Sequence, residues 1–145
     1  NLLAEIGPDM SFFPSDANLV SWAGLCPGSE ESAKKNRSGK TPKGNPWLRR
    51  ALVEPAWNAA RRKDGYLSAM YRGIAARRGS KRAVVAVART MLQAAWHVLS
   101  EGVEYKELGS NYLDQRHGEK TRNQLIKRLE KLGYEVSLTP KSVPV

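Results

Sequence analysis

The segment from Ser80 to Leu99 has the most regular apolar pattern in the chain. Apolar residues recur there three and four positions apart, at Ala83, Val84, Val87, Ala88, Met91, Leu92, Ala95, Trp96 and Leu99. This spacing places them on one broad face of an α-helix, and such a face has to be buried against other elements. The segment predicts a long core helix with Ser80 as its N-terminal cap, and it favours an all-helical fold.

Four further segments have helix signals. One helix is expected to start at Ser15 or Asp16 and stop at Gly24, and another to start at the Asn45 cap with Pro46 in its first turn. Apolar spacing predicts two more, over residues 66–77 and before Gly133. We expect an all-α domain of five or six helices over residues 1–140, with a short extended segment at residues 134–138 and a frayed tail at 141–145.

Two local predictions concern proline and tryptophan. Pro55 lies inside the helix that starts at Pro46, so a kink or break near residues 51–55 is expected. The four tryptophans occupy helical core spacings and are assigned to the core: Trp22, Trp47, Trp57 and Trp96.

Composition excludes several classes of protein. The chain of 145 residues has one cysteine, Cys26, so it cannot form an internal disulfide, and its two histidines lie far apart, so no zinc-ligand spacing is present. No apolar run approaches the roughly 18 to 20 residues that span a membrane. We therefore expect neither a structural metal nor a membrane partner.

Charge is concentrated in the middle of the chain. The net formal charge is +10, but residues 1–33 contain five acids and no Lys or Arg, whereas residues 34–89 contain sixteen bases and two acids. A confined positive field of this size attracts polyanions, because each Lys or Arg that meets a phosphate releases counterions. Nucleic acid is the leading predicted partner.

Residues 27–44 form a long polar segment without a large apolar residue. Loops of this length in a compact domain are uncommon and tend to be either functional or disordered, and both interpretations stay open. The segment contains Ser29, Ser32 and Ser38 among basic residues that could surround a phosphate. The cations assigned to nucleic-acid binding are Lys34, Lys35, Arg37, Lys40, Lys43, Arg49 and Arg50, and a second basic group surrounds a helix junction at residues 77–82.

Four sequence blocks together resemble one family. They are AEIG at residues 4–7, FPSDANLVSWAGLCPG at 13–28, ESAKKNRSGKTPKGNPWLRRALVEPAWNAAR at 31–61, and RAVVAVARTML at 82–92. Their order resembles the C-terminal part of the bridge-RNA-guided transposases, which pair an N-terminal DEDD RuvC-like domain with a C-terminal transposase domain. The resemblance implies a DNA-cutting and DNA-joining activity through a serine nucleophile, which matches Ser32 best, with Ser38 as the alternative.

The resemblance also implies partners that lie outside this chain. The family's RuvC-like domain, with four acidic residues that hold divalent metal, is expected upstream, so no metal ligand and no cofactor is assigned here. DNA, a guide RNA, the RuvC-like domain and a homo-oligomeric partner are the expected partners, in the bacterial cytoplasm at the nucleoid. Whether the isolated chain is an active enzyme stays open.

A second hypothesis needs only the basic field and the apolar helix of residues 83–99. On this interpretation the chain is a non-catalytic nucleic-acid-binding or oligomerisation module, and Ser32 is incidental.

Overall fold

The computed structural model describes residues 2–27, 31–32, 35–36, 41–116 and 118–139. The chain forms two compact units, Asn1–Ser110 and Asn111–Val145, which are described separately. Both are helical, which confirms the all-α class expected from the apolar periodicity. The proposed domain extent of residues 1–140 stays a prediction.

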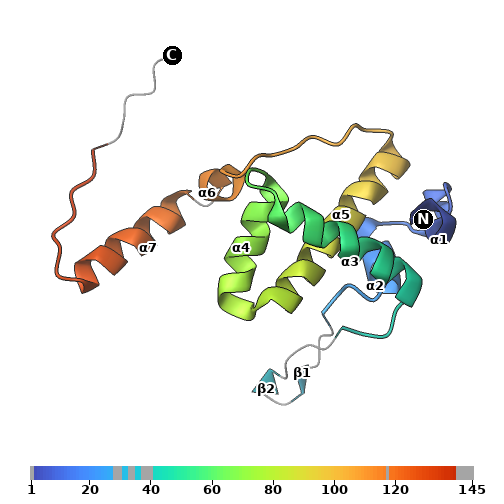
Figure 1. Ribbon diagram of the computed structural model, residues 1–145, viewed down its shortest axis with the longest axis horizontal. Coiled ribbons are helices and arrows are strands. Elements are labelled where there is room, and N and C mark those ends of the chain that lie inside the picture. The colour runs from blue at the N-terminus through green and yellow to red at the C-terminus, as the bar shows by residue number, and fades with distance from the viewer. Residues whose placement is uncertain (1, 28–30, 33–34, 37–40, 117, 140–145) are drawn as a thin grey trace. The chain divides into compact units, whose positions relative to one another are not determined.

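The first unit is organised around one long helix, α5 (Figure 1). Helix α5 contacts α2, α3 and α4 and also the short 3₁₀ helix η1, while α1 contacts α3. The elements of this unit are α1 Leu2–Ile6, η1 Met10–Phe12, α2 Asp16–Trp22, β1 Glu31–Ser32, β2 Lys35–Asn36, α3 Pro46–Arg61, α4 Tyr66–Arg78 and α5 Ser80–Glu101.

The core lies where α5 meets α2 and α3. The predicted face of α5 is confirmed, since its buried residues are Ala83, Val84, Val87, Ala88 and Leu92. They pack in one cluster with residues of α2, α3 and the segment between them, which include Leu19, Val20, Leu25, Leu48 and Leu52. By length and composition α5 could also cross a membrane. Its packing against three other helices is that of a core helix.

Local sequence signals determine where these helices begin and end. Ser15 caps α2 by accepting a hydrogen bond from the amide of Asn18, and Asn45 caps α3 by accepting from the amides of Trp47 and Leu48. Both caps were predicted. The predicted Ser80 cap was wrong: Gly79, at φ +84°, both ends α4 and precedes α5, and Ser80 is the first residue of α5.

Helix α3 runs without a break through Pro55. Of the two outcomes expected there, the break was wrong, and the kink stays a prediction. Proline removes a single backbone hydrogen bond, and the residues around it keep the helix packed. Leu52 and Ala56 on either side of Pro55 are buried in the core. Tertiary packing of this face therefore outweighs the local penalty.

Two of the four predicted core tryptophans are exposed. Trp22 and Trp47 have 45% and 69% of their surface accessible, so their core assignment was wrong. Trp57 and Trp96 pack against the core as predicted, and the Trp96 indole N–H donates to the Phe13 carbonyl over 2.9 Å. The exposed pair lies at helix ends, where apolar spacing does not determine which face is covered.

Helix α4 receives its N-terminal cap from a distant residue. Its own N-cap position, Gly65, makes no side-chain hydrogen bond, but Glu107 Oε1 accepts from the amide of Tyr66 over 2.6 Å. The second carboxylate oxygen accepts from the Tyr105 hydroxyl over 3.0 Å. The pKa of Glu107 lies below its ordinary value of 4.5, chiefly because of the hydrogen bond from the Tyr66 amide.

The second unit contains α6 Tyr112–Arg116 and α7 Gly118–Lys131, which contact each other. Helix α7 is the predicted last helix, and its apolar residues Leu125 and Leu129 are exposed. The segment expected to be extended, residues 134–138, contains no helix and pairs with no described neighbour as a strand. A strand needs a neighbour to satisfy its amides, and the described residues supply none.

We expect Glu107→Ala to destabilise the fold by about 1 kcal/mol at neutral pH, as the loss of an N-terminal cap does. The lowered pKa means that this contribution is fully present above about pH 4.5, the ordinary value, and is lost as the pH falls through the folded-state pKa. Urea denaturation of the variant and the wild type between pH 7 and pH 3 measures both effects. Glu104→Ala, an exposed carboxylate in the same segment, is the matched control; equal losses in the two variants would contradict the cap.

Candidate nucleic-acid interface

The predicted catalytic serine lies in a short antiparallel hairpin. Strand β1 pairs with β2 so that Glu31 is opposite Asn36 and Ser32 is opposite Lys35. The alternative serine, Ser38, and the predicted cations Lys34, Arg37 and Lys40 lie outside the described residues. The sequence predicted only an irregular loop here, whereas in the structure the backbone at Ser32 pairs with that at Lys35.

The two ends of the loop of residues 27–44 meet in a close backbone contact. A Cβ atom at Gly24 would lie 2.5 Å from the Gly44 nitrogen and 2.9 Å from the Pro42 carbonyl oxygen, and one at Gly44 would overlap the Ala23 carbonyl group. Gly24 also has a φ of +69°, which side chains other than glycine rarely adopt. Only glycine fits at these two positions, so the contact holds both ends of the loop at one point.

Polar contacts fix the returning end of the loop. The side-chain amide of Asn45 donates to Glu5 Oε2 over 2.8 Å while its oxygen caps α3. One turn further along α3, Arg49 donates from Nη1 to the hydroxyl of Thr41 over 3.1 Å. The chain therefore enters α3 in one orientation, with Arg49 turned back toward the loop.

A cationic pocket of about 520 Å³ lies at the base of this loop. The loop ends contribute Leu25, Pro27 and Thr41, and the helices contribute Ile74, Val85 and Ala86. Five cationic residues complete the lining, and none of the described lining residues is acidic: the cations are Arg49, Arg78, Lys81, Arg82 and Arg89. The pocket thus joins Arg49 to the basic helix junction, two groups that lie about thirty residues apart in the sequence.

Arg89 is the cation that the sequence analysis did not single out. Its Nε atom is enclosed, and it makes no hydrogen bond to any residue that the structure describes. An arginine stays charged inside a protein, so an enclosed N–H without an acceptor is unfavourable by about 1 to 3 kcal/mol. The sequence analysis missed Arg89 because it lies among the apolar residues of α5. Apolar periodicity identifies the buried face of a helix but not the charged residues at the edge of that face.

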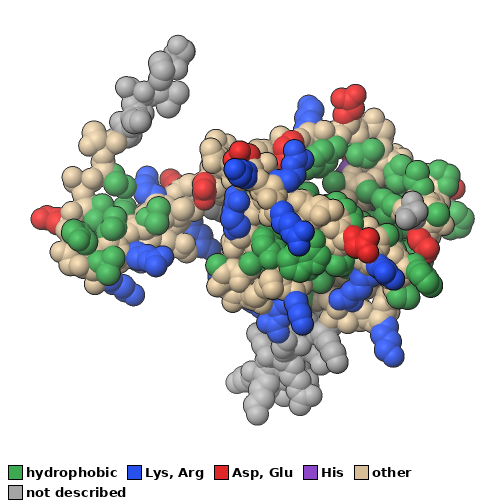
Figure 2. Space-filling model, in the orientation of Figure 1, with side chains coloured by type: hydrophobic (Ala, Val, Ile, Leu, Met, Phe, Trp, Pro, Cys, Tyr) green, Lys and Arg blue, Asp and Glu red, His purple; other side chains and the backbone are tan. Residues whose placement is uncertain are grey.

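Two other predicted cations do not line this pocket. Lys43 is exposed. Arg50 is also exposed and lies 3.6 Å from Glu54 on the next turn of α3, a surface ion pair of little energetic value. Figure 2 shows Lys and Arg side chains along the edge of the first unit from which the hairpin emerges in Figure 1. Exposed cations therefore lie along this edge of the first unit.

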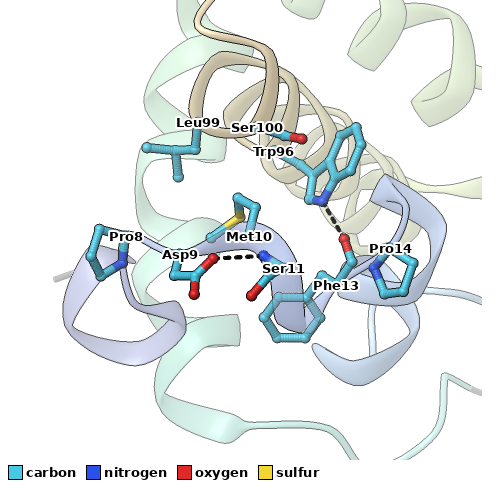
Figure 3. Close-up of a pocket in the computed structure, with 9 residues that line it drawn as sticks. All are labelled: Pro8, Asp9, Met10, Ser11, Phe13, Pro14, Trp96, Leu99 and Ser100. Atoms are coloured by element: carbon cyan, nitrogen blue, oxygen red, sulfur yellow. Dashed lines mark hydrogen bonds between the residues drawn. The ribbon is translucent and has the colours of Figure 1, made fainter.

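The acidic residues serve as caps, hydrogen-bond acceptors or surface charges. Asp9 lines a second cavity (Figure 3), where its carboxylate accepts from the amide of Ser11 over 2.9 Å, and that hydrogen bond lowers the pKa of Asp9. Asp16 accepts from the side-chain amide of Gln93. Over the described part of the chain, no three His, Cys, Asp or Glu side chains are placed to hold a metal ion.

Comparison with known proteins identifies relatives of this chain. Residues 1–72 match the model of the Transposase IS116/IS110/IS902 family. A Sinorhizobium fredii (strain NBRC 101917 / NGR234) protein named "Putative transposase y4pF/y4sB" is 30% identical over 112 residues. The alignment covers 74% of this chain, which spans only 29% of that relative's length. No solved structure matches. The matches support a transposase role.

Gly44→Ala should open the base of the loop, because its Cβ overlaps the backbone of Ala23 and neither segment can move without disturbing the core. We expect a loss of about 2 kcal/mol in unfolding free energy, typical of a forced steric insertion. The matched control is Gly73→Ala, where no atom lies within 4 Å of the added carbon and a helical alanine is favoured by up to about 1 kcal/mol. Thermal and urea denaturation compare the two, and a neutral Gly44→Ala would refute the contact.

Proposed function

We propose that this chain is the DNA-acting domain of a transposase of the IS116/IS110/IS902 family, with Ser32 as the nucleophile and Ser38 as the alternative. The observation that carries the proposal is the cationic pocket at the base of the serine-bearing loop. The family match supports it independently, because residues 1–72 include the whole loop and the start of α4.

The proposed chemistry is a transesterification. The Ser32 hydroxyl gives up its proton as its oxygen attacks phosphorus and forms a serine–phosphate ester. The bond from phosphorus to one DNA oxygen breaks, and that oxygen takes up a proton as it leaves. One phosphoester bond is formed for each one broken, so the step needs no energy-rich cofactor. Lys34, Lys35, Arg37, Lys40 and Lys43 would stabilise the charge that accumulates on the phosphate oxygens during attack.

The complete reaction is proposed to need further components. By resemblance, a RuvC-like domain supplies acidic residues and divalent metal, and a guide RNA selects the DNA. A homo-oligomer would bring two DNA ends together in the bacterial cytoplasm. The proposal therefore expects the isolated chain to bind DNA without cutting it.

Ser32→Ala should abolish covalent protein–DNA adducts in an active transposase that contains this chain, because the attacking oxygen is gone, while DNA binding persists. Denaturing gel electrophoresis of labelled DNA with the protein measures the adduct. Ser29→Ala and Ser38→Ala, in the same loop, are the matched variants. Adducts that survive in Ser32→Ala and vanish in Ser38→Ala move the nucleophile to Ser38. Adducts that survive in all three variants favour the non-catalytic binding module.

Replacing Lys34, Lys35, Arg37, Lys40 and Lys43 together by glutamine should weaken DNA binding and flatten its salt dependence. Every cation that no longer pairs with a phosphate lowers the slope of log affinity against log salt by about 1. The control replaces five cations of the second unit, which changes the net charge equally: Lys120, Arg122, Lys127, Arg128 and Lys131. Fluorescence anisotropy over a salt series measures both proteins, and equal slopes would place the DNA on another surface.

A further inference from the structure

We propose that the pocket between the loop base and the α4–α5 junction binds a DNA backbone phosphate other than the one that Ser32 attacks. This inference rests on the proposed function and deepens it, because it assigns a separate anchoring site. Arg89, one of the residues that line this pocket, is the residue on which the inference chiefly rests. In this role Arg89 positions the DNA and takes no part in the attack.

The first observation is the enclosed Nε of Arg89, which lacks an acceptor among the described residues. Arginine presents its N–H groups in a planar fork that matches two oxygens of a phosphate. An anion that enters the pocket would satisfy this donor with a charge-assisted hydrogen bond, which removes the unfavourable contribution of the unpaired N–H.

The second observation is the composition of the pocket wall. Four further cations, Arg49, Arg78, Lys81 and Arg82, line the same space as Arg89. Like charges that converge on one cavity repel each other, and a bound anion offsets this repulsion. The apolar wall formed by Leu25, Ile74 and Val85 reduces solvent screening and strengthens the attraction.

The third observation is the start of α5. Its N-cap, Gly79, has no side chain to accept from the first amides, so the helix has no side-chain cap. Lys81 and Arg82 in this first turn line the pocket, so the positive end of the helix dipole adds to the charge of the side chains. The helix terminus, the cations and the enclosed arginine all add to the positive potential of this pocket.

The size of the pocket specifies the ligand class. At about 520 Å³ it lies within the range of small-molecule sites, about 300 to 1,000 Å³, and has room for a phosphate with a flanking sugar. The polar residues that line it are the five cations and Thr41. Such a set recognises a sugar-phosphate backbone without selecting a base sequence.

The first test uses inorganic phosphate as the probe on the full chain. In ¹H–¹⁵N spectra, phosphate should shift the Arg89 Nε–Hε signal and the amides of residues 80–82, and chloride at equal ionic strength should not. Ser32→Ala should show the same shifts, because the anchoring site is separate from the nucleophile. Phosphate shifts no larger than those from chloride would overturn the proposal.

The second test measures affinity for a short DNA duplex. Arg89→Gln should weaken DNA binding roughly tenfold, since a hydrogen bond to a charged group is removed. Arg89→Lys should recover only part of this affinity, because lysine lacks the planar pair of N–H groups that arginine presents to a phosphate. Arg72→Gln, an exposed α4 arginine outside the pocket, is the matched control. Lys81→Gln, at an exposed site, keeps the test valid if the Arg89 variants fail to fold.

The two proposals fail in different ways. If Arg89→Gln and Lys81→Gln weaken binding no more than Arg72→Gln, the anchoring site is refuted whatever the serine does. If phosphate binds in the pocket and these variants weaken DNA binding, the anchoring site stands even when the serine variants all retain their adducts. That second result would refute the proposed nucleophile alone.

Discussion

The close backbone contact between Gly24 and Gly44 is the constraint on which the candidate site depends. Buried residues surround it, since Ala23 and Leu25 precede the loop and Leu48 follows it, each with no more than 1% of its surface exposed. The loop therefore leaves the core and returns to it at one point. Because the residues between these ends are not needed for the core, their sequence is free to be polar and basic.

The same contact determines where the charges meet. The base of the loop lies beside the α4–α5 junction, so Arg49, Arg78 and Arg89, from three helices, line one pocket. In the extended sequence these residues are separate members of a basic region. In the fold they share a space with an apolar wall, where each charge acts more strongly than on an open surface. The pocket is thus a product of tertiary structure, although the positive field that surrounds it was evident from composition.

The helices could be predicted wherever local signals and apolar periodicity agreed. The Asn45 cap and the buried face of α5 are examples, because both depend on residues a few positions apart. Features that depend on distant residues could not be predicted. The cap that Glu107 provides to Tyr66 joins residues 41 positions apart, and no local pattern indicates it. Trp47 and Trp57 occupy one helix, yet only Trp57 packs against the core, because in the first turn the neighbouring Leu48 occupies the buried position. The site was predictable in its residue types and its loop, but not in its hairpin or its pocket.

Under the proposed function, the fold assigns two tasks to different kinds of structure. A nucleophile has to approach phosphorus along one direction and then release it, which suits a residue on a loop. An anchoring phosphate site has to be rigid, because an error in its position would also displace the DNA phosphate that the serine attacks. Arg89 meets that need, since it lies on α5, the helix that contacts α2, α3 and α4. A rigid anchor beside the closed base of the loop would hold the DNA in place for attack by the serine.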